Sequence, residues 1–293
     1  MKRKDSLDLN GVVGLVGFAV VLAFNQVVIK LMNGGFGPVF GAGVRSLLAL
    51  VVLGLWIAFG RGRMGALRAT LWPGLLLGLL FTFEFIFVFT AMDMTSVSRA
   101  SITFYSMPIW LALVAHFALP GEQLSRRRAA GLGLAMLGVG WALADPHSRA
   151  EGDLRGDLLA LFGSWCWAGI ALTVRLTRVS ELPASGQLIW QLGVSAVLLL
   201  ALAPLMGPLW RDPGLLEWSA MGYGVLTASI GFTFWLWLMT IYPASDIASF
   251  SFLTPVLAVL FGWLVFGEPV GVQFGLALLL VAVGIVLINK RRR

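Results

Sequence analysis

The sequence is poor in the residues that enzymes, metal sites and disulfide-bonded scaffolds depend on. Among 293 residues there are one cysteine, Cys166, and two histidines, and charged residues make up only 12%. A single cysteine excludes an intramolecular disulfide, and it leaves no spacing of cysteine and histidine that would hold zinc. We therefore predict no catalytic residue, no metal site and no cofactor. A soluble domain usually has about 25% charged residues, so the low charged fraction also argues against a soluble protein.

Apolar residues are abundant instead, at 59% of the chain, together with 35 glycines and 12 tryptophans. They form continuous runs of about 17–23 residues, the length that a membrane-spanning helix requires. A transmembrane β-barrel would show alternating segments of about ten residues, and these are absent from the sequence. The pattern predicts an all-α membrane protein with ten transmembrane helices, at residues 10–32, 38–60, 70–92, 96–118, 129–145, 157–175, 184–206, 217–241, 245–266 and 270–289.

The net charge of +7 would suggest a nucleic-acid partner in a soluble protein. Here the basic residues lie between apolar runs, where they set membrane orientation, and we predict no nucleic-acid partner. Fifteen lysines and arginines fall on one side of the predicted membrane, in residues 2–4, 61–68, 126–128, 175–178 and 290–293. Four fall on the other side, Arg99, Arg149, Arg155 and Arg211. This bias predicts that both termini are cytoplasmic, which requires an even number of spans. The first apolar run is interpreted as a retained helix rather than a cleaved signal peptide.

The two halves of the chain share motifs at a nearly constant offset of 145–147 residues. The matching pairs are Asp8-Leu9-x-Gly11 with Asp153-Leu154-x-Gly156, Ser98 with Ser245, Pro108 with Pro255, and Gly121-Glu122 with Gly267-Glu268. This pattern predicts a first repeat at residues 1–147 and a second at 148–293. Because each half contains five predicted spans, an odd number, the second repeat must be inverted. Inverted repeats are typical of secondary transporters, whose substrate site lies near the membrane midplane between the repeats.

Several motifs resemble one known family. They are Asn25-x4-Lys30, Arg45 to Ala49, Thr95 to Ala100 leading to Pro108, Ala244-Ser245-x-x-Ala248, Leu253-Thr254-Pro255-Val256 and Gly267-Glu268-Pro269. Together they resemble the EamA family of the drug/metabolite transporter superfamily, and the sequence is also similar to that family's aromatic amino acid exporter branch. The resemblance implies a multi-pass protein of the bacterial inner membrane, with two inverted five-helix repeats around a central cavity. It also implies that Asn25 contributes to this cavity.

Two charged residues lie well inside the apolar runs, away from the ends of the predicted helices. Glu84 is in an aromatic segment, Phe81 to Phe89, and a carboxylate at that depth costs several kcal/mol unless it is paired, hydrated or protonated. It is interpreted as a proton-coupling group or a ligand for a substrate ammonium, and the alternative is a hydrogen-bonded residue that packs helices. Arg45 could bind a substrate carboxylate or pair with an acid.

Prolines and hydroxyl groups mark the next candidates. Pro108 and Pro255 lie at matching repeat positions, and proline breaks the helical hydrogen-bond ladder, so we predict two hinges; static kinks are the alternative. Further cavity residues are predicted on the faces of the same two helices, at Ser101, Tyr105, Ser249 and Phe252. The serines could instead hold helices together. Among the tryptophans, Trp165 and Trp235 are predicted to line the cavity, and lipid-facing or packed rings are the alternative.

These features predict a secondary transporter that works by alternating access, with the lipid bilayer and a small-molecule substrate as its partners. The resemblance implies that it exports amino acids, chiefly aromatic and other apolar ones. The motif Gly-x4-Gly-Lys-Ser/Thr is absent, so the chain does not hydrolyse ATP by that route. Transport of nucleotide sugars, cationic drugs or lipid headgroups remains an alternative. A membrane-embedded enzyme is disfavoured because clustered acids or metal ligands are missing. The oligomeric state is not readable from the sequence.

Overall fold

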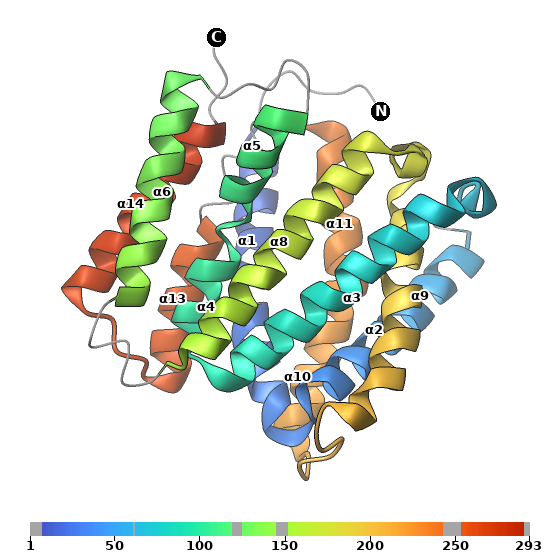
Figure 1. Cartoon of the computed structure of the whole chain (residues 1–293). Coiled ribbons are helices and arrows are strands. Elements are labelled where there is room, and N and C mark those ends of the chain that lie inside the picture. Colours follow the sequence, from blue (N-terminus) through green and yellow to red (C-terminus); the bar gives the residue numbers. More distant parts are fainter. Residues whose placement is uncertain (1–7, 61, 119–124, 145–151, 243–252, 290–293) are drawn as a thin grey trace.

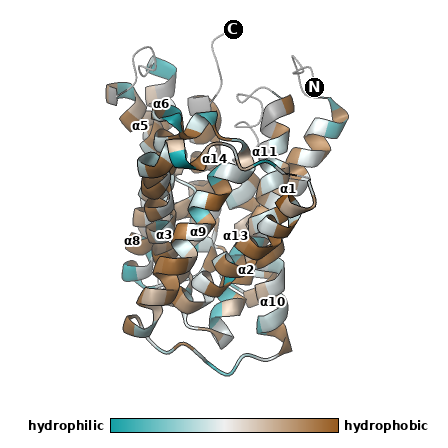
Figure 2. Ribbon diagram, turned by 90° about the vertical axis from the view of Figure 1, so that its right-hand side faces the viewer, coloured by the Kyte–Doolittle hydropathy of each residue, from teal (hydrophilic) through white to brown (hydrophobic). Residues whose placement is uncertain are grey.

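The structure is a computed structural model that describes residues 8–60, 62–118, 125–144, 152–242 and 253–289. These residues form a bundle of helices, and an isolated β-bridge joins Phe36 to Trp210. Figure 1 shows that the start of α1 and the end of α14 lie at the same end of the bundle. Figure 2 shows apolar residues along the middle of the helices and hydrophilic residues concentrated toward both ends, as in a membrane protein.

Six of the described helical segments are long and apolar enough to cross a membrane. They are α1 (Leu9–Gly35), α2 (Pro38–Ala58), the 3₁₀ turn η1 (Leu67–Thr70) with α3 (Leu71–Met94), α4 (Val97–Phe104) with α5 (Met107–Ala118), α8 (Leu154–Leu176), and α9 (Ala184–Leu202) with η3 (Ala203–Leu205). The other segments are α6 (Arg126–Ala144), η2 (Arg178–Glu181), α10 (Leu215–Leu226), the π-helical turn η4 (Thr227–Gly231), α11 (Phe232–Ile241), α13 (Leu253–Phe266) and α14 (Val272–Asn289). An all-helical membrane fold is thus confirmed, whereas the number of crossings and the inversion of the repeats stay predictions.

The predicted helix at 96–118 is interrupted in the structure. The N–H of Tyr105 still donates to Ser101 O at 2.9 Å, but Ser106 N turns to Thr103 O at 3.2 Å, so α4 ends there. Pro108 is the second residue of α5, a position that needs no N–H donor. It therefore starts a new helix instead of bending a continuous one. Pro255 is the third described residue of α13, and the segment before Leu253 lies outside the described residues.

The helices pack closely where small residues meet. α6 lies along α14 at one edge of the bundle (Figure 1). A Cβ atom on Gly284 would be 2.5 Å from Gly131 O, and one on Gly138 would be 2.7 Å from Ala277 O. In lipid, such close backbone contact is a main source of helix association. In the rest of the bundle, α1 packs against α10 and α13, and α3 packs against α8 and α9, which leaves room for a cavity between them.

Candidate functional site

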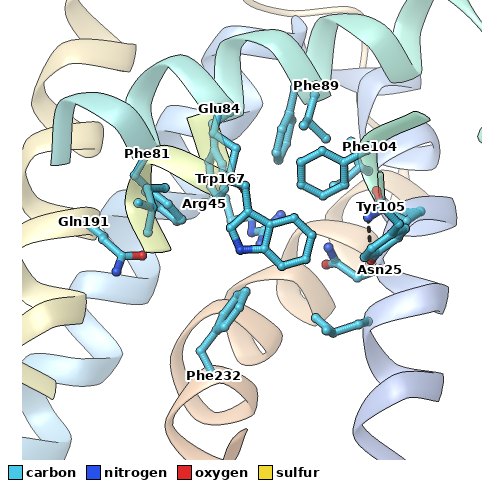
Figure 3. Close-up of a pocket in the computed structure, with 16 residues that line it drawn as sticks. Asn25, Arg45, Phe81, Glu84, Phe89, Phe104, Tyr105, Trp167, Gln191 and Phe232 are labelled. Carbon is cyan, nitrogen blue, oxygen red and sulfur yellow. Dashed lines mark hydrogen bonds between the residues drawn. The ribbon is translucent and has the colours of Figure 1, made fainter. Parts of the chain in front are cut away.

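A cavity of about 90 Å³ lies between α1, α2, α3, α8, α9, α11 and the end of α4. Its polar lining residues are Asn25, Gln26, Arg45, Glu84, Tyr105 and Gln191. Its aromatic lining residues include Phe81, Phe85, Phe89, Phe104, Trp167 and Phe232. Figure 3 shows that these side chains come from several helices and converge on one space. Segments that are far apart in the sequence therefore build a single site inside an apolar bundle.

Arg45 and Glu84 are the charged groups of this lining, and only 2% and 8% of their surfaces are exposed. No ion pair joins them, although the structure describes both side chains. Within the described residues, Arg45 Nε and Glu84 Oε2 have no hydrogen-bond partner. The guanidinium Cζ instead lies 5.0 Å from the ring centroid of Phe85 and 5.5 Å from that of Phe89. Burying an ion without a partner is costly, so this arrangement is suited to a ligand that supplies the missing charges.

Space for the Arg45 side chain depends on a glycine of α10. A Cβ atom on Gly224 would be 3.2 Å from Arg45 Cδ and 3.6 Å from Nε. The absence of a side chain at this position lets the arginine stem pass between α2 and α10. Gly224 is therefore a positioning residue for the cation.

Two amide side chains of α1 add acceptors to the cavity. Gln26 Nε2 donates a hydrogen bond of 2.9 Å to Tyr105 Oη, which links α1 to the end of α4 (dashed in Figure 3). Among the described residues, Gln26 Oε1 and Asn25 Oδ1 have no donor, and both residues are buried. The cavity thus contains two unused neutral acceptors in addition to Glu84.

The aromatic side of the cavity is ordered around Trp167 of α8. Its ring stacks on Phe104, with centroids 5.0 Å apart and an interplanar angle of 18°. It also meets Tyr105 edge-on, at 5.7 Å and 73°. In Figure 3 the indole occupies the centre of the view, and Phe232 approaches from α11. These contacts hold the indole in one orientation beside the polar groups.

The structure brings four of the predicted cavity residues together, Asn25, Arg45, Glu84 and Tyr105. Ser101 lies one turn before Tyr105 and is fully buried, but it does not line the cavity. The predicted Ser249 and Phe252 lie outside the described residues.

The two predicted tryptophans lie elsewhere. Trp165 is 44% exposed and contacts Trp110 and Phe162 edge-on, away from the cavity. Trp235 stacks on Phe18 at 6.1 Å and also does not line it. Residues that are two positions apart on an α-helix point about 200° away from each other around the helix axis. Trp165 and Trp167 therefore face opposite sides of α8.

Sequence reasoning did not select Gln26, Trp167, Gln191 or Phe232 for the cavity. The spacing of small and polar residues along α8 indicates that Trp167 faces the interior of the bundle. Asp157, Ala160 and Ser164 are small or polar residues that recur every three or four positions, and all three are buried. Trp167 continues this series, whereas Trp165 does not. Gln191 is a polar residue inside an apolar run, as Asn25 is. Phe232 has no comparable signal because phenylalanines occur throughout the chain.

One end of α4 is held by the turn between α13 and α14. Glu268, 3% exposed, accepts hydrogen bonds from Val97 N at 2.6 Å, from Ser98 N at 2.8 Å and from Ser98 Oγ at 2.6 Å. A carboxylate at a helix N-terminus satisfies free N–H groups and complements the helix dipole. Since α4 ends at the cavity with Phe104 and is capped by Tyr105, this contact connects the end of the bundle to the site.

The same end of the bundle carries a buried ion pair. Arg99 of α4 pairs with Asp157 of α8, and the two side chains are 2% and 1% exposed. Thr95 Oγ1 also donates to Asp157 Oδ1 at 3.1 Å, and Lys30 Nζ donates to Thr95 O at 2.7 Å. The junction between α3 and α4 is therefore bonded to α1, α8 and the α13–α14 turn.

A second ion pair lies at the end of α3. Arg211, in the segment before α10, donates to Asp93 at 2.7 and 3.0 Å and to Asn33 O at 3.0 Å. The hydrogen bond to Asp93 raises the pKa of Arg211 further above its usual value. This pair adds a link between α1, α3 and the loop that precedes α10.

A bundle of apolar helices with a polar cavity between them is the architecture of a membrane transport protein. The model of the EamA-like transporter family matches the chain twice, at residues 9–144 and 154–290. The chain belongs to this family, and is accordingly a multi-pass membrane protein of a transporter family. The predicted membership of the EamA family is thereby confirmed, whereas the similarity to its aromatic amino acid exporter branch stays a prediction.

Two curated relatives and one solved structure illustrate the similarity. The chain is 23% identical to the uncharacterized transporter YoaV of Bacillus subtilis over 93% of its own length and 94% of the relative's. It is 29% identical to the uncharacterized protein PA1977 of Pseudomonas aeruginosa, covering 73% and 71% of the two chains. One crystal structure matches with a TM-score of 0.65 and 21% identity, over 93% of this chain and 94% of the other, and shows a shared fold.

Proposed function

We propose that the protein exports amino acids from the cytoplasm by alternating access, and that aromatic and other apolar amino acids are its preferred substrates. The observation that carries this proposal is the composition of the cavity. The buried guanidinium of Arg45 and the buried carboxyl group of Glu84 line the same space with no ion pair between them, beside an aromatic wall in which Trp167 stacks on Phe104. The transporter class itself follows from the family, whereas the substrate and the direction are our proposal.

The polar groups complement a zwitterion. Arg45 binds the substrate carboxylate, and Glu84 binds the ammonium group, while Asn25 Oδ1 and Gln26 Oε1 accept its remaining hydrogens. Hydrogen bonds to charged groups contribute about 1.5–3 kcal/mol each. A substrate that lacks either charge leaves a buried ion unpaired, so such a substrate is rejected. The site therefore selects for the backbone that all α-amino acids share.

The apolar groups complement a substrate side chain. Trp167 and Phe232 offer ring faces for an aromatic side chain, and an aromatic pair contributes about 0.5–1.5 kcal/mol beyond the burial of area. At about 90 Å³, the cavity is smaller than the roughly 300 Å³ of typical ligand pockets. The substrate must widen it on binding, and the break between α4 and α5 is where the lining can move.

For the membrane arrangement we propose ten crossings in two inverted repeats, residues 1–147 and 148–293, with both termini cytoplasmic in the bacterial inner membrane. The double family match supports the repeats. The shared end of α1 and α14 in Figure 1 supports an even number of crossings. In this orientation, the bonds of Glu268, Asp157 and Lys30 close the non-cytoplasmic end. The interruption before Pro108 then acts as a hinge, and we propose the same for Pro255.

Other substrate classes fit the cavity less well. A nucleotide sugar requires several cations for its phosphates, and among the lining residues, all of them described, Arg45 is the cation. A cationic drug would suit Glu84 and the aromatic rings, but Arg45 would repel it. The lining thus favours a zwitterion over either alternative.

The test is uptake into proteoliposomes that contain the purified protein. Labelled phenylalanine, tryptophan, methionine and threonine are supplied with and without a pH gradient. We expect saturable uptake of phenylalanine and tryptophan, and weaker uptake of threonine, because its side chain does not stack. Absence of saturable flux for every amino acid would overturn the proposal. A flux that responds to the pH gradient would assign proton coupling, with Glu84→Gln as the variant that removes it.

A further inference from the structure

A second, larger cavity lies on the side of the bundle, away from the substrate site. It has a volume of about 360 Å³ and is a groove between α2 and the segment formed by η4 and α11. Its α2 wall includes Val52, Leu53 and Trp56. Its opposite wall includes Ile230, Phe234 and Trp237. We refer to it as the α2–α11 groove.

The hydroxyl groups of the groove already take part in hydrogen bonds. Ser229 Oγ donates to Val225 O at 2.7 Å, and Thr233 Oγ1 donates to Ser229 O at 2.7 Å. Both hydroxyls thus bond to their own helix and offer little to a ligand. The remaining lining is aliphatic and aromatic, so the groove suits an apolar ligand.

The surroundings of the groove are those of a lipid-facing surface. On α2, the neighbouring Val51 and Leu55 are 51% and 54% exposed, and α2 is apolar and long enough to span a membrane. Trp56 lies within one turn of the end of α2, and Trp237 within about one turn of the end of α11. Tryptophans near helix ends are typical of the membrane interface. The groove therefore lies beside a surface expected to face lipid, and its tryptophan end is expected at the headgroup region.

Basic residues lie next to the tryptophan end. The loop after α2 folds back on Trp56, because a Cβ atom on Gly62 would be 3.1 Å from Trp56 Cδ1. This loop contains Arg63, and Arg68 follows in η1. Basic groups beside a membrane surface attract lipid phosphates, by about 1 kcal/mol each. The charge of the loop is thus complementary to a phospholipid headgroup above an apolar groove.

We propose that the α2–α11 groove binds one acyl chain of a glycerophospholipid, whose phosphate lies at the loop that contains Arg63. The shape, the apolar lining and the basic loop each match one part of this ligand. The binding of the lipid does not depend on which substrate the protein transports.

The position of the groove allows a bound lipid to influence the substrate cavity through the helical turn between them. The groove is lined by Ser229 and Ile230, which belong to the π-helical turn η4. Phe232, directly after this turn, lines the substrate cavity. π-Helical turns are rare and occur frequently at functional sites. A bound acyl chain therefore supports the turn from the side opposite the substrate, a consequence that rests on the proposed function.

The experiment measures retained phospholipid by native mass spectrometry of the full-length protein, released from mild detergent supplemented with palmitoyl-oleoyl phosphatidylglycerol. Val52→Trp fills the groove, and Val51→Trp is the matched control on the adjacent lipid-facing position. We expect one retained phospholipid in the wild type and in Val51→Trp, and a loss of at least fivefold in Val52→Trp. We also expect reduced retention in Arg63→Ser. If Val52→Trp does not fold, Thr233→Phe fills the groove from the opposite wall.

Equal retention in the wild type and in a folded groove-filling variant would overturn the lipid site. A lipid-free dimer would also overturn it, because the groove would then belong to a second copy of the chain. Phenylalanine flux is measured separately on the same variants. Lipid retention without flux in the wild type would contradict the proposed function and leave the lipid site intact. Unchanged flux after lipid loss would overturn only the inferred effect of the lipid on the substrate cavity through η4 and Phe232.

Discussion

Replacement of Trp167 by alanine separates aromatic recognition from recognition of the amino acid backbone. The indole lines the cavity and stacks on Phe104 with ring centroids 5.0 Å apart, and we propose that its other face contacts the substrate. Loss of one aromatic pair removes about 0.5–1.5 kcal/mol beyond the area term. Since about 1.4 kcal/mol is tenfold in affinity, we expect the KM for phenylalanine uptake to rise by about two- to tenfold in Trp167→Ala. The KM for threonine should change much less, because threonine has no ring to stack.

The matched control is Trp165→Ala, which removes an identical side chain from the opposite face of α8. Trp165 is 44% exposed and does not line the cavity, so its loss should leave both KM values within about twofold. Thermal unfolding in detergent is measured on both variants to separate binding from stability. An unchanged KM for phenylalanine in Trp167→Ala would refute the reasoning. So would an equal rise for phenylalanine and threonine, since the defect would then not concern the ring.

Three further substitutions test the supporting structure. Gly224→Ala places a methyl group 3.2 Å from Arg45 Cδ, so we expect weaker binding of phenylalanine with little change in unfolding temperature; an unchanged KM would contradict the positioning role. Glu268→Gln weakens three hydrogen bonds to the start of α4, at a cost of about 1–3 kcal/mol, and should lower the unfolding temperature. Asp157→Asn removes the carboxylate that pairs with the buried Arg99, and breaking a buried ion pair costs about 3–5 kcal/mol. Gel filtration should show mostly aggregated protein, and a monodisperse peak of normal yield would contradict the importance of this pair.

The helices follow from the sequence because lipid imposes a simple requirement on them. A segment must be apolar and long enough to cross, and it must bond its own backbone. The predicted range 38–60 corresponds to α2, and 184–206 corresponds to α9 with η3. A hinge or kink at Pro108 was expected within one continuous helix, but the helix is interrupted between α4 and α5, beginning at Tyr105. Proline only removes one backbone hydrogen bond of a helix. The packing of neighbouring residues decides where the chain turns.

The candidate site was predictable at those residues whose polar or charged side chains cost free energy when they are placed inside a membrane. Arg45 and Glu84 stand out because charged groups inside apolar runs require a partner or a ligand, whereas Asn25 was expected from the family resemblance. Aromatic residues carry no such signal, which is why Trp165 was selected and Trp167 was not. Their roles depend on helix rotation, and rotation is set by packing that the sequence does not record directly. The contact of Glu268 with Ser98 was also missed, because 170 residues separate the two.

Selection of a zwitterion by the cavity is tested most directly by counterflow in proteoliposomes. Vesicles loaded with phenylalanine take up labelled phenylalanine while one competitor is added outside. Tryptophan carries both charges, phenethylamine lacks the carboxylate, and 3-phenylpropionate lacks the ammonium group. We expect strong competition by tryptophan and at least tenfold weaker competition by the two analogues, since each leaves Arg45 or Glu84 unpaired. Equal competition by phenethylamine or by 3-phenylpropionate would contradict the assignment of the corresponding residue and of the zwitterion site.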